Sequence, residues 1–146
     1  MRKLVLLSLV IVTAAAVWFW RSANDEMAPP TEAGQIALGR QLYAENCASC
    51  HGANLEGQPG WKMPGPNGRL PAPPHDESGH TWHHADEQLF AITKLGTAAV
   101  VGNGYESDMP GFGSSLTDDE IRAVLLYIKG TWPEREAAYQ QGISRR

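Results

Sequence analysis

The sequence of 146 residues has few charged side chains, only two cysteines and no excess of positive charge. Charged residues make up 19% of the chain and the formal net charge is −4, so the basic face typical of nucleic-acid-binding proteins is not expected. Two cysteines cannot build a disulfide framework. Polar and apolar residues do not alternate over any useful length, so no β-sheet is expected. The fold class is therefore predicted to be all-α.

One long apolar run is present, and it lies at the N-terminus. Leu4–Trp20 follows the basic pair Arg2 and Lys3 and is just long enough to cross a hydrocarbon layer of about 30 Å. We predict that residues 1–21 are a transmembrane anchor, with the remainder of the chain on the periplasmic side of the cytoplasmic membrane. A cleaved signal sequence is the alternative, because Ala14–Ala16 resembles a cleavage site.

The rest of the chain is rich in glycine and proline, with 15 and 10 residues in the whole sequence, which predicts long loops between few helices. Residues 22–31 are expected to form a linker. Helices are predicted over 32–46 and 86–95, with loops over 52–81 and 102–115.

A further helix is predicted between Thr117 and Gly130. Thr117 and Glu120 have the spacing of a capping box, and glycine commonly ends a helix. The apolar residues in between recur at helical spacing and comprise Ile121, Val124, Leu125 and Ile128.

The most specific motif is Cys47-Ala48-Ser49-Cys50-His51, which has the pattern of a c-type haem attachment site. Two thiols on about one helical turn can reach both vinyl groups of one porphyrin, and the following imidazole can bind its iron. A thioredoxin-like pair would need a preceding strand, and a zinc site would need a second pair of ligands at suitable spacing. Neither pattern is present, so we predict one covalently bound haem c with its iron.

Met109 is the best candidate for a second iron ligand. It lies 58 residues after His51, in a glycine-rich loop just before the last predicted helix. A thioether is the usual partner of histidine in electron-transfer haems. The other methionines are less well placed, since Met27 lies in the linker and Met63 lies close behind the attachment motif.

Taken together, residues 31 to 130 resemble a class I c-type cytochrome, of the small membrane-anchored monohaem type found in bacteria. The segments that carry the resemblance are 42–52, 109–112 and 116–121. The resemblance implies the class I cytochrome c fold, in which the first and last helices cross around one haem. It assigns the thioether bonds to Cys47 and Cys50, and the iron ligands to His51 and Met109. The cytochrome c domain is then expected over 32–130, followed by a C-terminal extension over 131–146.

Two further expectations follow from the resemblance. Gly39 and Tyr43 of the first helix are expected to meet Val124 and Tyr127 of the last helix. A proline carbonyl is expected to accept the ring N–H of the proximal histidine and fix its orientation. The candidates for this proline are Pro73 or Pro74, which resemble the Pro-Pro form of the family, with Pro66 as the alternative.

A histidine-rich stretch departs from the simplest family pattern and contains His75, His80, His83, His84 and the neighbouring Trp82. We interpret these histidines as forming local hydrogen bonds, with a haem propionate among the possible acceptors. A copper or zinc site is a second interpretation, and displacement of Met109 by one of them is a third. Trp82 is expected to pack at the haem edge or to bind a propionate.

The predicted function is that of a one-electron carrier and not of an enzyme, because histidine and methionine together leave no open position on the iron. Its expected partners are a quinol-oxidising complex or dehydrogenase as donor and a terminal oxidase or reductase as acceptor, both at the membrane. No nucleic-acid partner is expected. The alternative is a haem-based catalytic or sensor subunit with an open iron position.

Overall fold

The computed structural model describes residues 18–19 and 31–145. Trp18 and Phe19 are helical and exposed, and they belong to a unit of the chain separate from residues 32–146. Apart from these two residues and Thr31, the predicted anchor and linker lie outside the described residues. Among the residues that are described, no helix has the length and apolar character needed to cross a membrane.

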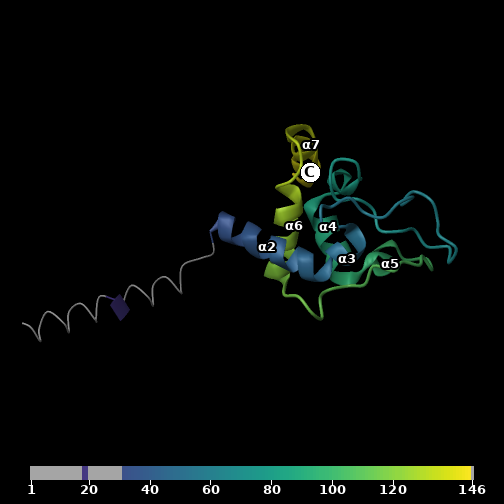
Figure 1. Ribbon diagram of the computed structural model, residues 1–146, viewed down its shortest axis with the longest axis horizontal. Coiled ribbons are helices and arrows are strands. Elements are labelled where there is room, and N and C mark those ends of the chain that lie inside the picture. Colours follow the sequence, from purple (N-terminus) through teal and green to yellow (C-terminus); the bar gives the residue numbers. More distant parts are fainter. Residues whose placement is uncertain (1–17, 20–30, 146) are drawn as a thin grey trace, which may run out of the picture. The chain divides into compact units, whose positions relative to one another are not determined.

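The second unit contains helices and loops, and its described residues include no strand, as predicted. Figure 1 shows the helices in chain order. They are α2 (Glu32–Asn46), α3 (Ala48–His51), the 3-10 helix η1 (Thr81–His83), α4 (Asp86–Leu95), α5 (Thr97–Val101), α6 (Asp118–Lys129) and α7 (Glu134–Ser144).

The first and last predicted helices, α2 and α6, cross and pack directly against each other (Figure 1). Gly39 permits this approach, since a Cβ atom there would lie 1.9 Å from the carbonyl oxygen of Ala123 and 3.1 Å from the Cβ of Tyr127. The rings of Tyr43 and Tyr127 lie 5.6 Å apart. The expected contact face is therefore present, with Ala123 as an additional member, and Val124 is buried in the core beside it.

The start of α6 has the capping box that the sequence predicts. The hydroxyl of Thr117 accepts a hydrogen bond from the backbone N–H of Glu120, and the Glu120 carboxylate accepts one from the backbone N–H of Thr117. Ile121 and Ile128 then face the core, with 0% and 3% of their surface exposed. The core cluster consists of Leu42, Tyr43, Leu55, Leu89, Leu116, Ile121, Val124, Ile128 and Trp132.

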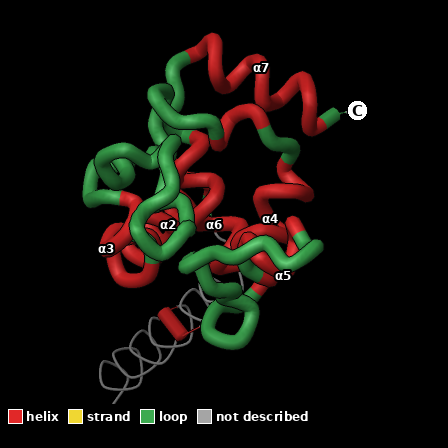
Figure 2. The backbone as a smooth tube through the Cα atoms, turned by 90° about the vertical axis from the view of Figure 1, so that its right-hand side faces the viewer, coloured by secondary structure: helices red, strands yellow, loops and turns green. Residues whose placement is uncertain are grey.

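Loops make up much of the domain and are drawn in green in Figure 2. Residues 52–80 form a long loop between α3 and η1, and residues 102–117 form another before α6, close to the predicted bounds. The short helix α5 was not predicted. It follows Gly96, whose φ of +88° ends α4 and redirects the chain.

The C-terminal extension is folded onto the domain. Helix α7 packs against η1. The indole N–H of Trp132 donates to the backbone oxygen of His75 at 2.7 Å. The buried amide of Gln140 donates to the carboxylate of Asp86 at 2.7 Å. This helix was not predicted because the residues that it buries are Glu136 and Gln140, so no apolar stripe marks it in the sequence.

Candidate functional site

The attachment motif forms one tight turn directly after α2. The backbone N–H of Cys47 donates to Tyr43, and the N–H of His51 donates back to the oxygen of Cys47, both at 2.9 Å. Cys47 is half-buried and Cys50 is exposed, and both are free thiols. Burial, with a smaller effect from Cys50, raises the pKa of Cys47 to about 11, so that thiol is protonated at neutral pH. Both sulfurs are therefore available on one turn for covalent attachment.

The ring of His51 is buried and its orientation is fixed by a proline. Its Nδ1 atom lies 2.8 Å from the carbonyl oxygen of Pro73. A carbonyl can only accept, so Nδ1 carries the proton and the Nε2 lone pair is left for a metal. Burial lowers the pKa of His51, while the bond to Pro73 opposes that shift, and the neutral ring is the form that binds iron.

Among the candidate prolines, Pro73 provides the carbonyl. The oxygen of Pro74 instead accepts a hydrogen bond of 3.4 Å from the Thr81 hydroxyl. One face of the His51 ring is covered by His75, whose ring is stacked on it at 4.0 Å between centroids. His75 is held by a 2.8 Å hydrogen bond between its Nδ1 and the Thr81 hydroxyl. The sequence did not predict this stacking.

Met109 is fixed in its loop by polar contacts on both its backbone and its sulfur. Its N–H donates to the hydroxyl of Ser107 at 3.2 Å, and the hydroxyl of Thr97 donates to its sulfur at 3.3 Å. A thioether sulfur has two lone pairs, so this contact leaves one for an iron ion. Met63, in contrast, is 70% exposed.

The loop after Met109 is locked onto the end of α4. The N–H groups of Phe112 and Gly113 donate to the carbonyls of Thr93 and Lys94 at 2.9 and 3.0 Å. Gly111 is required for this approach, since a Cβ there would lie 2.6 Å from the carbonyl carbon of Leu95. The side chain of Met109 is therefore presented from a loop whose C-terminal side is rigidly attached.

The histidine-rich stretch forms stacking contacts. His83 stacks on Trp82 at 3.7 Å, and His80 stacks on Trp61 at 5.3 Å, both measured between ring centroids. Burial is the largest influence lowering the pKa of His80, followed by the neighbouring His84. In the described part of the chain, no group of three or more His, Cys, Asp or Glu residues is arranged to hold a metal ion. The copper or zinc interpretation therefore finds no support there.

Comparison with known proteins matches residues 36–132 to the family model described as "Cytochrome c". The chain belongs to the cytochrome c family. It therefore carries covalently bound haem c with iron, and its family relationship supports a role as a haem electron carrier.

Among curated relatives, this cytochrome is 30% identical over 97 residues to the "Cbb3-type cytochrome c oxidase subunit CcoP" of Azospirillum sp. (strain B510), which covers 66% of this chain and 29% of that protein. It is 26% identical over 100 residues to the FixP subunit of Bradyrhizobium sp. (strain ORS 278), covering 68% of this chain and 29% of that protein. It is 31% identical over 96 residues to cytochrome c6 of Tetradesmus obliquus, covering 64% of this chain and 86% of that protein.

The chain thus spans under a third of the length of its CcoP and FixP relatives. No solved structure matched it.

The residues present fit haem c. Two free thiols and a neutral imidazole lie on one turn, as thioether attachment and proximal ligation require. Among the described residues, the indole N–H of Trp82 is the one buried side-chain polar group without a hydrogen-bond partner. A buried N–H group without a partner costs free energy unless an acceptor is supplied. A haem propionate can accept a hydrogen bond from it.

Proposed function

We propose that this cytochrome is a one-electron carrier whose haem is attached through Cys47 and Cys50 and whose iron is bound by His51 and Met109. The observation that carries the proposal is the fixed ring of His51. Its Nδ1–H is bound to Pro73, so its Nε2 has one defined direction in which to bind iron. When bound, the haem supplies an iron centre that gains and loses one electron.

Met109 favours electron transfer over catalysis. Its loop is locked at Phe112 and Gly113, and its sulfur is contacted by Thr97. Because contacts within the protein already hold the thioether in place, its binding to iron costs little conformational entropy. A thioether also stabilises ferrous iron and closes the position at which oxygen or peroxide would react. No described feature favours the alternative of a catalytic or sensor haem.

We also propose that the haem domain, residues 32–130, works at the outer face of the cytoplasmic membrane, anchored through residues 1–21 and the linker 22–31. In this arrangement residues 131–146 extend the domain. The relatives named as subunits of cbb3-type cytochrome c oxidase support a terminal oxidase of that kind as electron acceptor. A quinol-oxidising complex or dehydrogenase is the proposed donor.

The optical spectrum of the purified haem protein tests the proposed ligation. Ferric iron bound to a thioether has a weak charge-transfer band at the red edge of the visible, and we expect that band here. We also expect the ferrous protein not to bind carbon monoxide, because both axial positions are filled. A high-spin ferric spectrum or ready carbon monoxide binding would instead identify an open haem and overturn the carrier proposal.

A further inference from the structure

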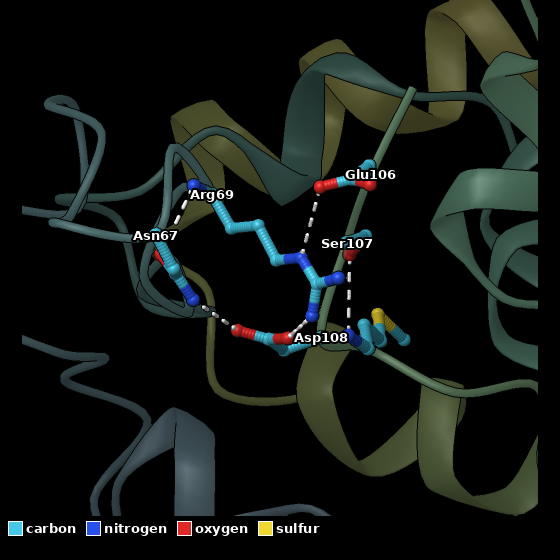
Figure 3. Close-up of polar contacts among 6 residues, drawn as sticks. Asn67, Arg69, Glu106, Ser107 and Asp108 are labelled. Carbon is cyan, nitrogen blue, oxygen red and sulfur yellow. Dashed lines mark hydrogen bonds and ion pairs between the residues drawn. The ribbon is translucent and has the colours of Figure 1, made fainter. Parts of the chain in front are cut away.

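An ion-pair network connects the two long loops of the domain (Figure 3). The guanidinium of Arg69 forms an ion pair with Asp108 and lies 3.5 Å from the carboxylate of Glu106. The amide of Asn67 contacts the second oxygen of Asp108 at 3.4 Å. Arg69 and Asp108 are 39 residues apart in the sequence, so this network is a tertiary contact and not a local turn. We call these four residues the Arg69 clasp.

Arg69 is presented to the clasp by a tight turn. The N–H of Gly65 donates to the carbonyl of Arg69 at 2.8 Å, and the N–H of Arg69 donates to the side-chain oxygen of Asn67 at 3.1 Å. Gly68 lies within the turn with φ of +77°, a conformation that favours glycine. The planar guanidinium fork can bind two carboxylates at once, which a lysine cannot do in the same way.

The clasp lies next to the candidate distal ligand. Asp108 directly precedes Met109, and the N–H of Met109 is bound to Ser107. On the C-terminal side, Met109 is already secured by the backbone bonds of Phe112 and Gly113 to α4. The Arg69 clasp therefore supplies the side-chain attachment on the N-terminal side. Arg69 also lies four residues before Pro73, so the clasp connects the segment that orients His51 with the one that presents Met109.

We infer that Arg69 is a positioning residue for the distal iron ligand. Through Asp108 it restricts the loop before Met109, and this keeps the thioether bound to iron in competition with other ligands. The inference rests on the proposed function, in which Met109 binds the iron. Arg69 has 36% and Asp108 60% of its side chain exposed, so the effect is modest and weakens with salt.

The test is the affinity of the full-length ferric haem protein for imidazole, which must displace Met109 in order to bind. We expect Arg69→Gln and Asp108→Asn each to tighten imidazole binding about two- to fivefold at low salt. The double variant should bind little more tightly than either single variant, because both remove the same interaction. High salt should bring the wild-type affinity close to that of Arg69→Gln. Arg69→Lys should restore only part of the wild-type value.

Lys129→Gln is the matched control, since Lys129 pairs with Asp86 at 2.6 Å with similar exposure, on elements that do not include the Met109 loop. If Arg69→Gln and Lys129→Gln change imidazole affinity equally, the inference is wrong and any effect is one of general stability. Met109→Ala separates the two proposals. If it tightens imidazole binding strongly while Arg69→Gln matches the control, the inference fails alone. If Met109→Ala has no effect, the proposed ligation fails and the inference with it.

Discussion

The Nδ1 atom of His51 lies 2.8 Å from the carbonyl oxygen of Pro73, a residue 22 positions later in the chain. This bond sets the tautomer and the direction of the His51 ring in one interaction. The position of the Pro73 carbonyl in turn depends on the loop around it. A substitution elsewhere in that loop, with His51 and Pro73 both retained, should therefore change the properties of the haem.

Gly57→Ala is expected to disturb this bond. Gly57 has φ of +67°, and a Cβ there would lie 2.7 Å from the carbonyl carbon of Pro73 and 2.5 Å from the nitrogen of Pro74. The added methyl group must displace the segment that carries the Pro73 carbonyl, at a cost of about 1–3 kcal/mol beyond the backbone strain. We expect a lower thermal unfolding midpoint and a shifted reduction potential, measured by calorimetry and by redox titration.

Gly60→Ala is the control for this prediction. Gly60 has nearly the same φ, +69°, but nothing lies within 4 Å of a Cβ at that position. The Gly60→Ala variant has the same backbone strain but no clash, so the reduction potential of its haem should stay at the wild-type value. Equal effects of the two variants would show that strain alone is responsible.

Met109→Ala should leave the haem attached but open the iron. Exogenous ligands should then bind, and the reduction potential should fall because the thioether favours ferrous iron. Ligand titrations and a redox titration measure both effects. Met63→Ala is the control, as Met63 is 70% exposed and should change neither property. The reverse result would assign the ligand to Met63.

Replacing Cys47 or Cys50 by alanine should sharply reduce the amount of mature protein. A large apolar haem bound to the folded state of so small a domain would stabilise it, so loss of attachment should remove folding free energy. Haem-stained gels and the yield of folded protein measure the outcome. A normal yield of a haem-free helical domain from the double variant would contradict the prediction.

The contact between α4 and α7 should weaken in acid. Burial alone would raise the pKa of Asp86, but hydrogen bonds from Lys129, Gln140 and Ser144 outweigh it and hold the pKa below its ordinary value of 3.8. A carboxyl group whose pKa is lowered by folding stabilises the protein above the unfolded-state pKa, and this contribution is lost as pH falls below about 4.

Asp86→Asn should therefore reduce the acid dependence of the unfolding free energy, measured by urea titration between about pH 3 and 6. Glu87→Gln, which removes an exposed carboxylate from the same first turn of α4, is the comparison. If both variants retain the wild-type pH profile, Asp86 does not carry this dependence.

Tethering should accelerate electron transfer to a membrane oxidase. If residues 1–21 anchor the chain as proposed, a linker of about ten residues would span under about 20 Å on average and would hold the domain near partners in the same membrane. From residue 24 onward the chain has nine Lys or Arg and 16 Asp or Glu, a charge of −7, so a basic docking surface is expected on the partner. Two of these cations, Arg69 and Lys94, are paired with carboxylates.

The measurement compares full-length protein with a chain that begins at Ser22, at equal low concentration and over a range of salt. The anchored protein should reduce the oxidase faster, and its rate should fall as salt increases. A soluble form that is equally fast, or a rate that is indifferent to salt, would exclude a tethered electrostatic carrier.

The sequence by itself determined the features that depend on spacing within one segment. The attachment turn at Cys47–His51, the capping box at Thr117 and the apolar face of α6 all follow from residues a few positions apart, because helical geometry relates them directly. Gly39 was expected at a close contact from the resemblance to class I cytochromes c, and the absence of a side chain there is what lets the backbone of Ala123 approach.

Only the tertiary structure decided which groups from distant loops meet. The choice of Pro73 over Pro74 and Pro66, the stacking of His75 on His51, the contact from Thr97 to Met109 and the Arg69 clasp all join residues that no periodicity relates. Loops have no regular spacing from which a partner can be predicted, and their path is fixed by glycine turns and by contacts formed when the domain packs. Local sequence patterns identify the candidate ligands, whereas the contacts that hold them in place depend on the whole fold.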